Sequence, residues 1–351
     1  MNFAQPLKPL SLSDDRKSLI VLDQRLLPNK ELFLELKTKE EIFEAIQSLK
    51  VRGAPALGLA AAYGLCVVMS EYTQNPPMDF FRKSERIIYY FESARPTAVN
   101  PTITLNRLRS VMISALSVNN ISSETILELM YAEASKIEKE ESEASGKIGE
   151  SGLSLLKPGW GVLTHCNAGK LAAPGFGTAL SPLYLALERN YGLRIYSTET
   201  RPLLQGARLT AYELTKAGAD VTLLCDNAAA SLMAKGEINA VMTGCDRIAA
   251  NGDVANKIGT SNLAILASHY KIPFYILGPL STVDKSAPDG ESVVIEERDK
   301  REVTEMWFKE RVAPEKIKVY NPAFDITKAE MITAIITERG IYRYPYDFSN
   351  I

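Results

Sequence analysis

The second half of the chain repeats one pattern, in which a short apolar run leads into a polar loop and then into a helix-like segment. The apolar runs are WGVLTH, RIYSTE, DVTLLC, NAVMTG and IPFYILG, between residues 160 and 278. This alternation is typical of βαβ units, whose strands lie parallel in a single sheet. Right-handed crossovers bring the loops after the strands to one edge of that sheet, where open α/β folds bind ligands.

Polar side chains from these loops are therefore expected to converge at the carboxyl edge of the sheet: Cys166, Arg201, Gln205, Asp226 and Asp246. The stretch richest in such residues is TGCDRIAANGDVANKIGT, residues 243–260. We interpret it as one of the polar loops along this edge rather than as an ordinary turn. Asp246 alone would also suit a helix cap or a turn.

Cys166 lies at the end of a predicted strand, immediately before Asn-Ala-Gly. A buried structural thiol is the commoner fate of a cysteine, but this position favours a reactive one. His165 adjoins it, yet successive residues of a strand point to opposite faces, which makes a His/Cys dyad geometrically doubtful. The other cysteines, Cys66, Cys225 and Cys245, lie in or beside apolar runs and are predicted to be core residues.

Charge and composition narrow the class of partner. The 40 basic and 42 acidic residues nearly cancel, so we expect a small molecule rather than nucleic acid or an anionic membrane. The four cysteines lack both the spacing of a zinc site and the pattern of a disulfide framework, which predicts cytosolic thiols. We find no signal-peptide pattern and no apolar run that approaches the length needed to cross a bilayer, which predicts a cytoplasmic protein.

The first part of the chain is predicted to form short strands around residues 18–22 and 31–36, followed by helices. TKEEIFEAIQSL combines a Thr cap, Glu in the first turn and apolar residues at helical spacing. Residues 122–156 are amphipathic, with charges three and four apart, which predicts a solvated helix or a connector between domains. A length of 351 residues with 46% hydrophobic residues suits two domains.

A glycine-rich stretch in this first part, KVRGAPALGLAAAYG, is a candidate anion site. Arg52 and the amides of Gly53 and Ala54 would face a phosphate at the start of a helix. The alternative is a close helix contact that the small residues permit. The stretch is not a P-loop, because Leu-Ala follows where Lys-Ser/Thr is required, and the chain lacks the G-x-G-x-x-G of a dinucleotide site. SARPTAVNP offers a second arginine, Arg95, restrained by the proline after it.

Seven stretches along nearly the whole chain carry a resemblance to one family: VLDQRLLP, VRGAPALGLAAAYG, ARPTAVN, HCNAGKLA, ETRPLLQGARLTAYEL, GCDRIAANGDVANKIGT and NPAFDITKAEMITAIITERG. The chain resembles the methylthioribose-1-phosphate isomerases of methionine salvage. The resemblance implies an α/β protein with a mainly helical N-terminal domain with short strands, residues 1–150, and a Rossmann-like C-terminal domain with a mostly parallel sheet, residues 151–351. It also implies a homodimer that needs no metal and no organic cofactor.

The resemblance carries a catalytic pair onto Cys166 and Asp246. It carries contacts to phosphate and sugar onto seven further positions: Arg52, Gly53, Ala54, Arg95, Gln205, Asn256 and Lys257. The implied reaction converts an aldose 1-phosphate, whose capped anomeric oxygen prevents spontaneous ring opening, into a ketose 1-phosphate. We expect Asp246, kept protonated by an apolar closed site, to donate to the ring oxygen while the Cys166 thiolate removes the C2 proton. A direct hydride shift from C2 to C1 is the open alternative.

Two other functions stay open. Regulatory subunits of the translation initiation exchange factor share the fold but would be expected to lack the catalytic pair, which this chain retains. A paralogue that isomerises 5-deoxyribose 1-phosphate fits three departures from the family pattern: Cys245 where alanine is usual, Ser261 where tyrosine is usual, and residues 101–108 where an apolar run with tryptophan is usual. These changes would reshape the pocket around the sugar 5-position and leave the phosphate contacts intact.

Overall fold

The computed structural model describes residues 8–95 and 99–351, which divide into two compact units. The N-terminal unit contains the described residues up to Glu143 together with the segment 170–177. The C-terminal unit contains residues 144–169 and 178–351. The boundary lies inside the long helix α5, Ser123–Leu153, which contributes residues to both units. Each unit has a hydrophobic core of its own.

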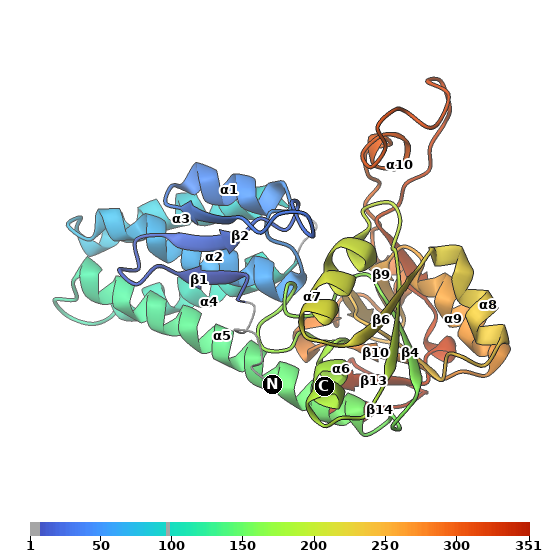
Figure 1. The fold of residues 1–351 in the computed structure, drawn as a ribbon. Helices are drawn as coiled ribbons and strands as arrows, with labels where there is room; N and C mark the ends of the chain where they lie inside the picture. The colour runs from blue at the N-terminus through green and yellow to red at the C-terminus, as the bar shows by residue number, and fades with distance from the viewer. Residues whose placement is uncertain (1–7, 96–98) are drawn as a thin grey trace. The chain divides into compact units, whose positions relative to one another are not determined.

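The N-terminal unit, in its described part, combines three antiparallel strands with a group of helices (Figure 1). The elements are β1 Leu10–Leu12, β2 Leu19–Leu22, β3 Phe33–Leu36, α1 Lys39–Gln47, α2 Ala54–Met69, α3 Pro77–Ala94, α4 Val99–Leu116 and the first part of α5. The predicted strands and first helix are confirmed. Thr38 caps α1, because its hydroxyl accepts the N–H of Glu41 while the Glu41 carboxylate accepts the N–H of Thr38.

Helix α2 lies at the centre of the N-terminal core and is buried along its whole length beyond its first two residues. Its glycines permit close packing. A methyl group at Gly58 would lie 2.6 Å from the Thr104 hydroxyl of α4, and one at Gly64 would lie 2.8 Å from Ile42 of α1. The interpretation of this stretch as a close helix contact is therefore confirmed at these two positions.

The same segment corrects one expectation from the sequence. Residues 54–72 are long and apolar enough to cross a bilayer, by length and composition only, although no apolar run was expected to approach that length. However, 78% of its most apolar window is buried inside the structure, as in the core helix of a globular unit. One such segment is weak evidence for a membrane span, and its small apolar residues serve the packing just described.

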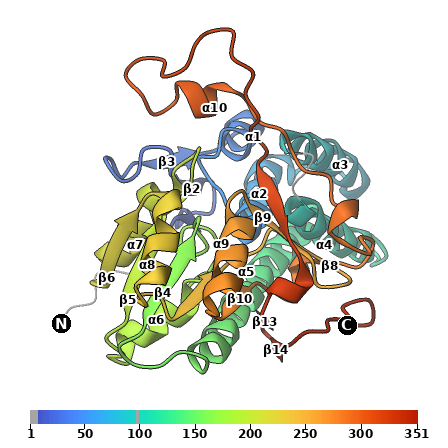
Figure 2. The same cartoon turned by 90° about the vertical axis from the view of Figure 1, so that its right-hand side faces the viewer.

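The main sheet of the C-terminal unit has seven strands among the described residues, in the order β14-β13-β10-β7-β4-β5-β6. Neighbours pair in parallel, except that the edge strand β14 is antiparallel to β13. The strands are β4 Gly161–His165, β5 Arg194–Thr198, β6 Asp220–Leu224, β7 Ala240–Thr243, β10 Phe274–Leu277, β13 Ala334–Thr337 and β14 Gly340–Tyr342. All five predicted runs are strands of this sheet, so the mostly parallel, Rossmann-like prediction is confirmed; Figure 2 shows β4, β5 and β6 side by side.

Short helices connect these strands (Figure 2). They are α6 Ser181–Glu188, α7 Ala211–Lys216, α8 Ala229–Ala234 and α9 Thr260–Tyr270. A further short helix, α10 Arg301–Thr304, follows later in the chain. A π-helical turn, η2, spans Gly206–Thr210 and runs directly into α7. Single 3-10 turns across the described chain are η1 Ser70–Tyr72, η3 Asp226–Ala228, η4 Leu280–Thr282, η5 Gly290–Ser292 and η6 Ala329–Met331.

A second sheet of the C-terminal unit was not predicted. In the described residues it has the order β11-β8-β9-β12, with strands β8 Arg247–Ala249, β9 Val254–Lys257, β11 Val283–Asp284 and β12 Phe324–Thr327. Much of the stretch 243–260 is therefore a β-hairpin, and its interpretation as a polar loop is wrong. The pairing partners β11 and β12 are distant in sequence, so local composition did not reveal them. Between β11 and β12 the chain makes an excursion around α10 that stands away from both sheets of this unit (Figures 1 and 2).

A buried carboxylate, that of Asp253, ties the hairpin to the rest of its unit. It accepts the N–H of Ala329 at 2.8 Å and that of Gly290 at 3.1 Å, and the ammonium of Lys328 lies 3.2 Å away. Burial alone would raise the pKa of Asp253, but these N–H groups and the ammonium outweigh burial and hold the pKa below its ordinary value of 3.8. The folded protein therefore favours the charged form.

We predict that Asp253→Asn lowers the free energy of unfolding of the C-terminal unit at neutral pH by about 1–3 kcal/mol, because an amide oxygen replaces only part of the carboxylate's acceptor capacity. The carboxylate's contribution is complete above pH 3.8 and is lost as the pH falls through the lower pKa of the folded protein. The difference from wild type should therefore shrink in acid. Urea unfolding followed by tryptophan fluorescence measures it, since Trp160 and Trp307 both belong to this unit.

The matched control is Asp220→Asn, which changes an exposed carboxylate of the same unit. This variant should unfold like the wild type at every pH. Equal losses in both variants, or a loss at Asp253 that does not depend on pH, would contradict the role assigned to the buried carboxylate.

Candidate active site

The order of the main sheet places two loops side by side. The chain proceeds from β4 to β5 and β6 on one side, and then returns to β7 on the other side of β4. His165 and Thr243, the last residues of β4 and β7, are paired in register. Connections that leave neighbouring parallel strands in opposite directions open a crevice at their carboxyl ends, which is where such folds bind ligands. Cys166 follows one of these strands, and Asp246 lies three residues beyond the other.

Cys166 has an unusual backbone conformation, with φ of +63°. A non-glycine residue in the left-handed region is strained, and such residues cluster at functional sites. The N–H of Cys166 donates to the Thr200 hydroxyl at 2.9 Å, and the Thr210 hydroxyl donates to the carbonyl of Cys166 at 2.6 Å. The residue is half-buried rather than part of the core, which favours the reactive thiol over the structural one.

Asp246 lies between β7 and β8 and is exposed. Its N–H donates to the carbonyl of Ala255 on β9, so the hairpin fixes its backbone. The next helix, α9, begins only at residue 260, and the helix-cap interpretation of Asp246 is therefore wrong.

Three predicted binding residues of the C-terminal unit are buried: Gln205, Asn256 and Lys257. The side-chain oxygen of Gln205, just before η2, has no hydrogen-bond partner among the described residues. Asn256 donates to the Thr260 hydroxyl at 3.0 Å. The Lys257 ammonium donates to a backbone carbonyl, that of Ala323, at 2.8 Å, and lies 4.8 Å from the centre of a phenylalanine ring. The buried, unsatisfied oxygen of Gln205 is the feature that points most directly to a ligand.

Asp325 on β12 is a residue that the sequence reasoning missed. Its carboxylate accepts the N–H of Gly259 at 2.7 Å and that of Ser261 at 3.1 Å, and its register partner on β9 is Asn256. Burial raises the pKa of Asp325 to about 6, although these N–H groups and the Lys257 ammonium oppose the shift. Asp325 therefore fixes the turn that follows the two predicted binding residues of β9. Its only signal in the sequence is its place within the NPAFDIT stretch.

Arg201 and Asp226, which were expected to converge with Cys166, are linked to it through Thr200, and their side chains bind backbone groups. The Asp226 carboxylate accepts the N–H groups of Thr200 and Arg201, each at 2.7 Å. The Arg201 guanidinium donates to the carbonyl of Val303 in the excursion at 2.8 Å and lies 5.5 Å from the ring centre of Phe308. Both side chains therefore shape the loop after β5, where they support the site.

His165 does not form a dyad with Cys166. Its Nδ1 lies 2.6 Å from the Thr198 hydroxyl, and its Nε2 lies 2.9 Å from the carbonyl of Ile258. Both ring nitrogens thus have partners other than Cys166. Burial lowers the pKa of His165, which keeps the imidazole neutral.

The other cysteines differ in their surroundings. Cys66 is buried on α2, as predicted, and burial raises the pKa of its thiol. Cys245 is half-buried beside the Thr282 hydroxyl, 3.5 Å away, and burial of its thiol raises its pKa to about 12. Cys225 is exposed, so the prediction that it is a core residue is wrong. It follows β6, the edge strand of the main sheet, where an apolar run does not imply burial on both faces.

The N-terminal unit holds the remaining predicted contacts: Arg52, Gly53, Ala54 and Arg95. Gly53 has φ of +92° and begins α2, and a methyl group there would lie 2.4 Å from the carbonyl oxygen of Ala172. Only glycine allows this segment, 170–177, to pass so close to the helix start. Arg52 and Arg95 are half-buried, the first just before α2 and the second just after α3. The positive end of α2 thus carries an arginine, which suits an anion.

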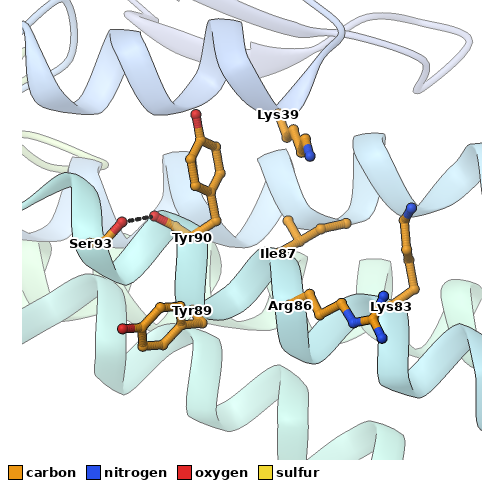
Figure 3. A pocket seen from close by; sticks show the side chains of 7 residues that line it. All are labelled: Lys39, Lys83, Arg86, Ile87, Tyr89, Tyr90 and Ser93. Atoms are coloured by element: carbon orange, nitrogen blue, oxygen red, sulfur yellow. Dashed lines mark hydrogen bonds between the residues drawn. The ribbon is translucent and has the colours of Figure 1, made fainter.

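The N-terminal unit also has a separate pocket of about 400 Å³ (Figure 3). It is lined by Lys39 of α1 and six residues of α3: Lys83, Arg86, Ile87, Tyr89, Tyr90 and Ser93. None of the predicted site residues lines it, so this pocket is not part of the candidate site.

Among residues 8–95 and 99–351, no cluster of three or more His, Cys, Asp or Glu side chains is arranged to hold a metal ion.

Residues 50–344 match the Initiation factor 2 subunit family, which spans most of the sequence. The chain belongs to the Initiation factor 2 subunit family. It is 56% identical over 335 residues to a methylthioribose-1-phosphate isomerase of Parabacteroides distasonis, with 95% of this chain and 98% of the relative covered. It is 52% identical over 338 residues to a 5-deoxyribose 1-phosphate isomerase of Petrotoga mobilis, with 96% of each covered.

The fold of this family member is similar to the solved structure of 5-methylthioribose 1-phosphate isomerase from Pyrococcus horikoshii. The TM-score is 0.90 at 38% identity, with 98% of this chain and 94% of the other covered. The family recognised from the seven sequence stretches is thereby confirmed, as is the fold that the resemblance implied. The relatives named as isomerases include one for 5-methylthioribose 1-phosphate and one for 5-deoxyribose 1-phosphate, so their names do not decide between these substrates.

The environments of the four cysteines of this family member lead to a labelling prediction. Iodoacetamide at neutral pH should modify Cys166 and Cys225 in the native protein, because the reagent can reach both thiols. The charge of Glu199 raises the pKa of Cys225, so this exposed thiol should react more slowly than its exposure alone implies. Burial of Cys66 and Cys245, which raises the pKa of each thiol, should protect both until the protein is denatured. Mass spectrometry of peptides over time measures the order. Early modification of Cys245 would contradict the protection expected from the raised pKa of its thiol.

Proposed function

We propose that this chain is an aldose–ketose isomerase that converts 5-methylthioribose 1-phosphate into 5-methylthioribulose 1-phosphate in methionine salvage. We further propose that it acts in the cytoplasm as a homodimer. The observation that carries the proposal is the placement of Cys166 and the Asp246 segment after the neighbouring strands β4 and β7, in a chain whose relatives are named as isomerases of this kind.

The chemistry follows from the substrate. An acid must protonate the ring oxygen to open the ring, because the 1-phosphate prevents spontaneous opening, and a base must then move hydrogen from C2 to C1. In the proposal Asp246 is the acid and the Cys166 thiolate is the base. As Asp246 protonates the ring oxygen, the C1–O bond to it breaks and leaves a cation at C1. The C2 proton passes to the thiolate, and its electron pair forms the C1–C2 double bond of an enol phosphate and neutralises C1. The Cys166 thiol then returns its proton to C1 while the Asp246 carboxylate takes the proton of the C2 hydroxyl, which leaves a C2 ketone and restores both groups. Since Asp246 is exposed in the described structure, its protonated state requires the bound substrate to exclude water.

A direct hydride shift from C2 to C1 is the alternative course, with Cys166 accepting the proton of the C2 hydroxyl. Deuterium from solvent can exclude the hydride shift but cannot prove it. Deuterium at C1 of the ketose excludes a pure hydride shift, whereas its absence is compatible with a shielded proton transfer.

Binding of the substrate is assigned to the remaining residues. We propose that Arg52, Arg95 and Lys257 neutralise the phosphate dianion, helped by the amides of Gly53 and Ala54 at the positive end of α2. Gln205 and Asn256 would hold sugar hydroxyls. The buried Gln205 oxygen, which lacks a partner among the described residues, supports this assignment because a substrate hydroxyl would satisfy it.

We predict that Cys166→Ser and Asp246→Asn each lower kcat by at least about 100-fold, because each removes a proton-transfer group. Both variants should fold, since neither side chain belongs to a core. The matched controls are Cys225→Ser and Asp220→Asn, which change exposed residues of the same types in the same unit. Turnover is measured by NMR from the appearance of the ketose. Near-normal turnover by Cys166→Ala would show that the base is assigned to the wrong residue.

The 5-deoxyribose 1-phosphate isomerase of Petrotoga mobilis, 52% identical, makes the 5-deoxy sugar the second candidate substrate. We predict kcat/KM values for the 5-methylthio and 5-deoxy sugars within about 200-fold of each other, because an apolar pocket discriminates weakly against so small a group. Loss of the 1-phosphate should reduce kcat/KM far more. Side-by-side kinetics with the three compounds measure this. Strict rejection of either phosphorylated sugar, or good turnover of the unphosphorylated one, would contradict this prediction. Either result would show that the 5-substituent, and not the 1-phosphate, decides which sugars are accepted.

The regulatory alternative has its own outcome. A purified chain that binds the sugar phosphates but turns over neither of them would be a binding subunit of this fold and not an isomerase. If the purified chain alone turns over either sugar phosphate, it is not solely a binding subunit.

A further inference from the structure

The backbone of Cys166 is held by hydroxyl groups from the loop after β5 and from η2. The Thr200 hydroxyl accepts the Cys166 N–H at 2.9 Å, and the Thr210 hydroxyl donates to its carbonyl at 2.6 Å. Thr200 and Thr210 are both fully buried. The two bonds grip the peptide groups on both sides of a residue whose φ is +63°. Together these two hydrogen bonds hold the strained backbone of Cys166 in its left-handed conformation.

Thr200 is itself fixed by a charged partner. Its own φ is +63°, and the Asp226 carboxylate accepts its N–H and that of Arg201, each at 2.7 Å. Charge-assisted hydrogen bonds of this kind are roughly twice as strong as neutral ones. The chain of contacts therefore runs from the Asp226 carboxylate through the Thr200 backbone to the Thr200 hydroxyl and on to the Cys166 N–H.

We infer that Thr200, held in place by Asp226, is a positioning residue that keeps the Cys166 thiol in its working orientation, an inference that rests on the proposed function. Without the hydroxyl, the Cys166 N–H loses its partner and the residue has less reason to remain in the left-handed region. A relaxed φ swings the Cβ–Sγ bond away from its native direction. Reacting groups displaced by about 1 Å can lose about 100-fold in rate, so a positioning effect of this kind is measurable.

The test compares Thr200→Val with Thr200→Ser. Valine keeps the shape of threonine and removes the hydroxyl, whereas serine keeps the hydroxyl and removes only a methyl group. We expect Thr200→Val to lower kcat by about 10–100-fold with KM within about threefold of wild type, because binding groups stay in place. Thr200→Ser should retain most of the activity, and Asp226→Asn should fall between the two. Thr222→Val, an exposed threonine on β6, is the matched control and should behave as wild type.

A second readout does not depend on turnover. All variants are made in a Cys225→Ser background, so that iodoacetamide labelling in the native state reports on Cys166. We expect Thr200→Val to label Cys166 at least about fivefold faster than wild type, since a released loop opens more often. Cys66 and Cys245 should stay unlabelled, which separates local release from general unfolding.

The outcomes separate this inference from the proposed function. Slower turnover together with faster Cys166 labelling in Thr200→Val, and recovery of both in Thr200→Ser, supports the positioning role. Unchanged kcat and unchanged labelling in Thr200→Val overturn it while the isomerase proposal stands. A wild-type chain without turnover overturns the proposed function, and the labelling comparison then still decides whether Thr200 holds Cys166.

Discussion

The candidate site depends on one constraint, which is the parallel pairing of β4 with β7 at the point where the strand order reverses. His165 and Thr243 end these strands in register, so the next residues of both strands must leave the sheet beside each other. The interior residues of both strands are buried, which makes this register costly to change. The position of Cys166, and that of the hairpin carrying Asp246, follows from this pairing. Every chemical role proposed for the two side chains presupposes it.

Beside Cys166, one group of buried polar side chains is paired and restricts the loop that follows β4. Asn167, next to Cys166, donates to the Thr210 hydroxyl at 3.1 Å and to the Glu213 carboxylate, which also accepts the Tyr184 hydroxyl at 2.8 Å. Glu213 is buried, so removal of either donor would cost a hydrogen bond to a buried carboxylate. Networks in which every member is satisfied stiffen a structure. This stiffness is what a strained residue such as Cys166 requires.

The main sheet could be predicted because its strands are continuous apolar runs separated by glycine-bearing loops. Each such run can be recognised from its own few residues, without knowledge of its pairing partner. The sequence did not predict the second sheet, because the strands of the β8–β9 hairpin are short and polar in part, and their further partners β11 and β12 are distant along the chain. Cys225 was misjudged because an apolar run does not reveal that β6 is an edge strand. Cys166 could be proposed as a candidate from its place at a strand end. The Thr200 and Asp226 contacts could not be proposed, since they depend on a positive φ at Thr200 that no motif encodes.

The most direct test of the account is whether substrate covers Cys166. The rate at which iodoacetamide modifies Cys166 is measured at increasing concentrations of 5-methylthioribose 1-phosphate, with the exposed Cys225 as internal reference. We expect modification of Cys166 to slow and saturate, with half of the effect near KM, while modification of Cys225 stays constant. An unchanged rate at Cys166 while the enzyme is turning over saturating substrate would contradict the placement of the reaction at the ends of β4 and β7.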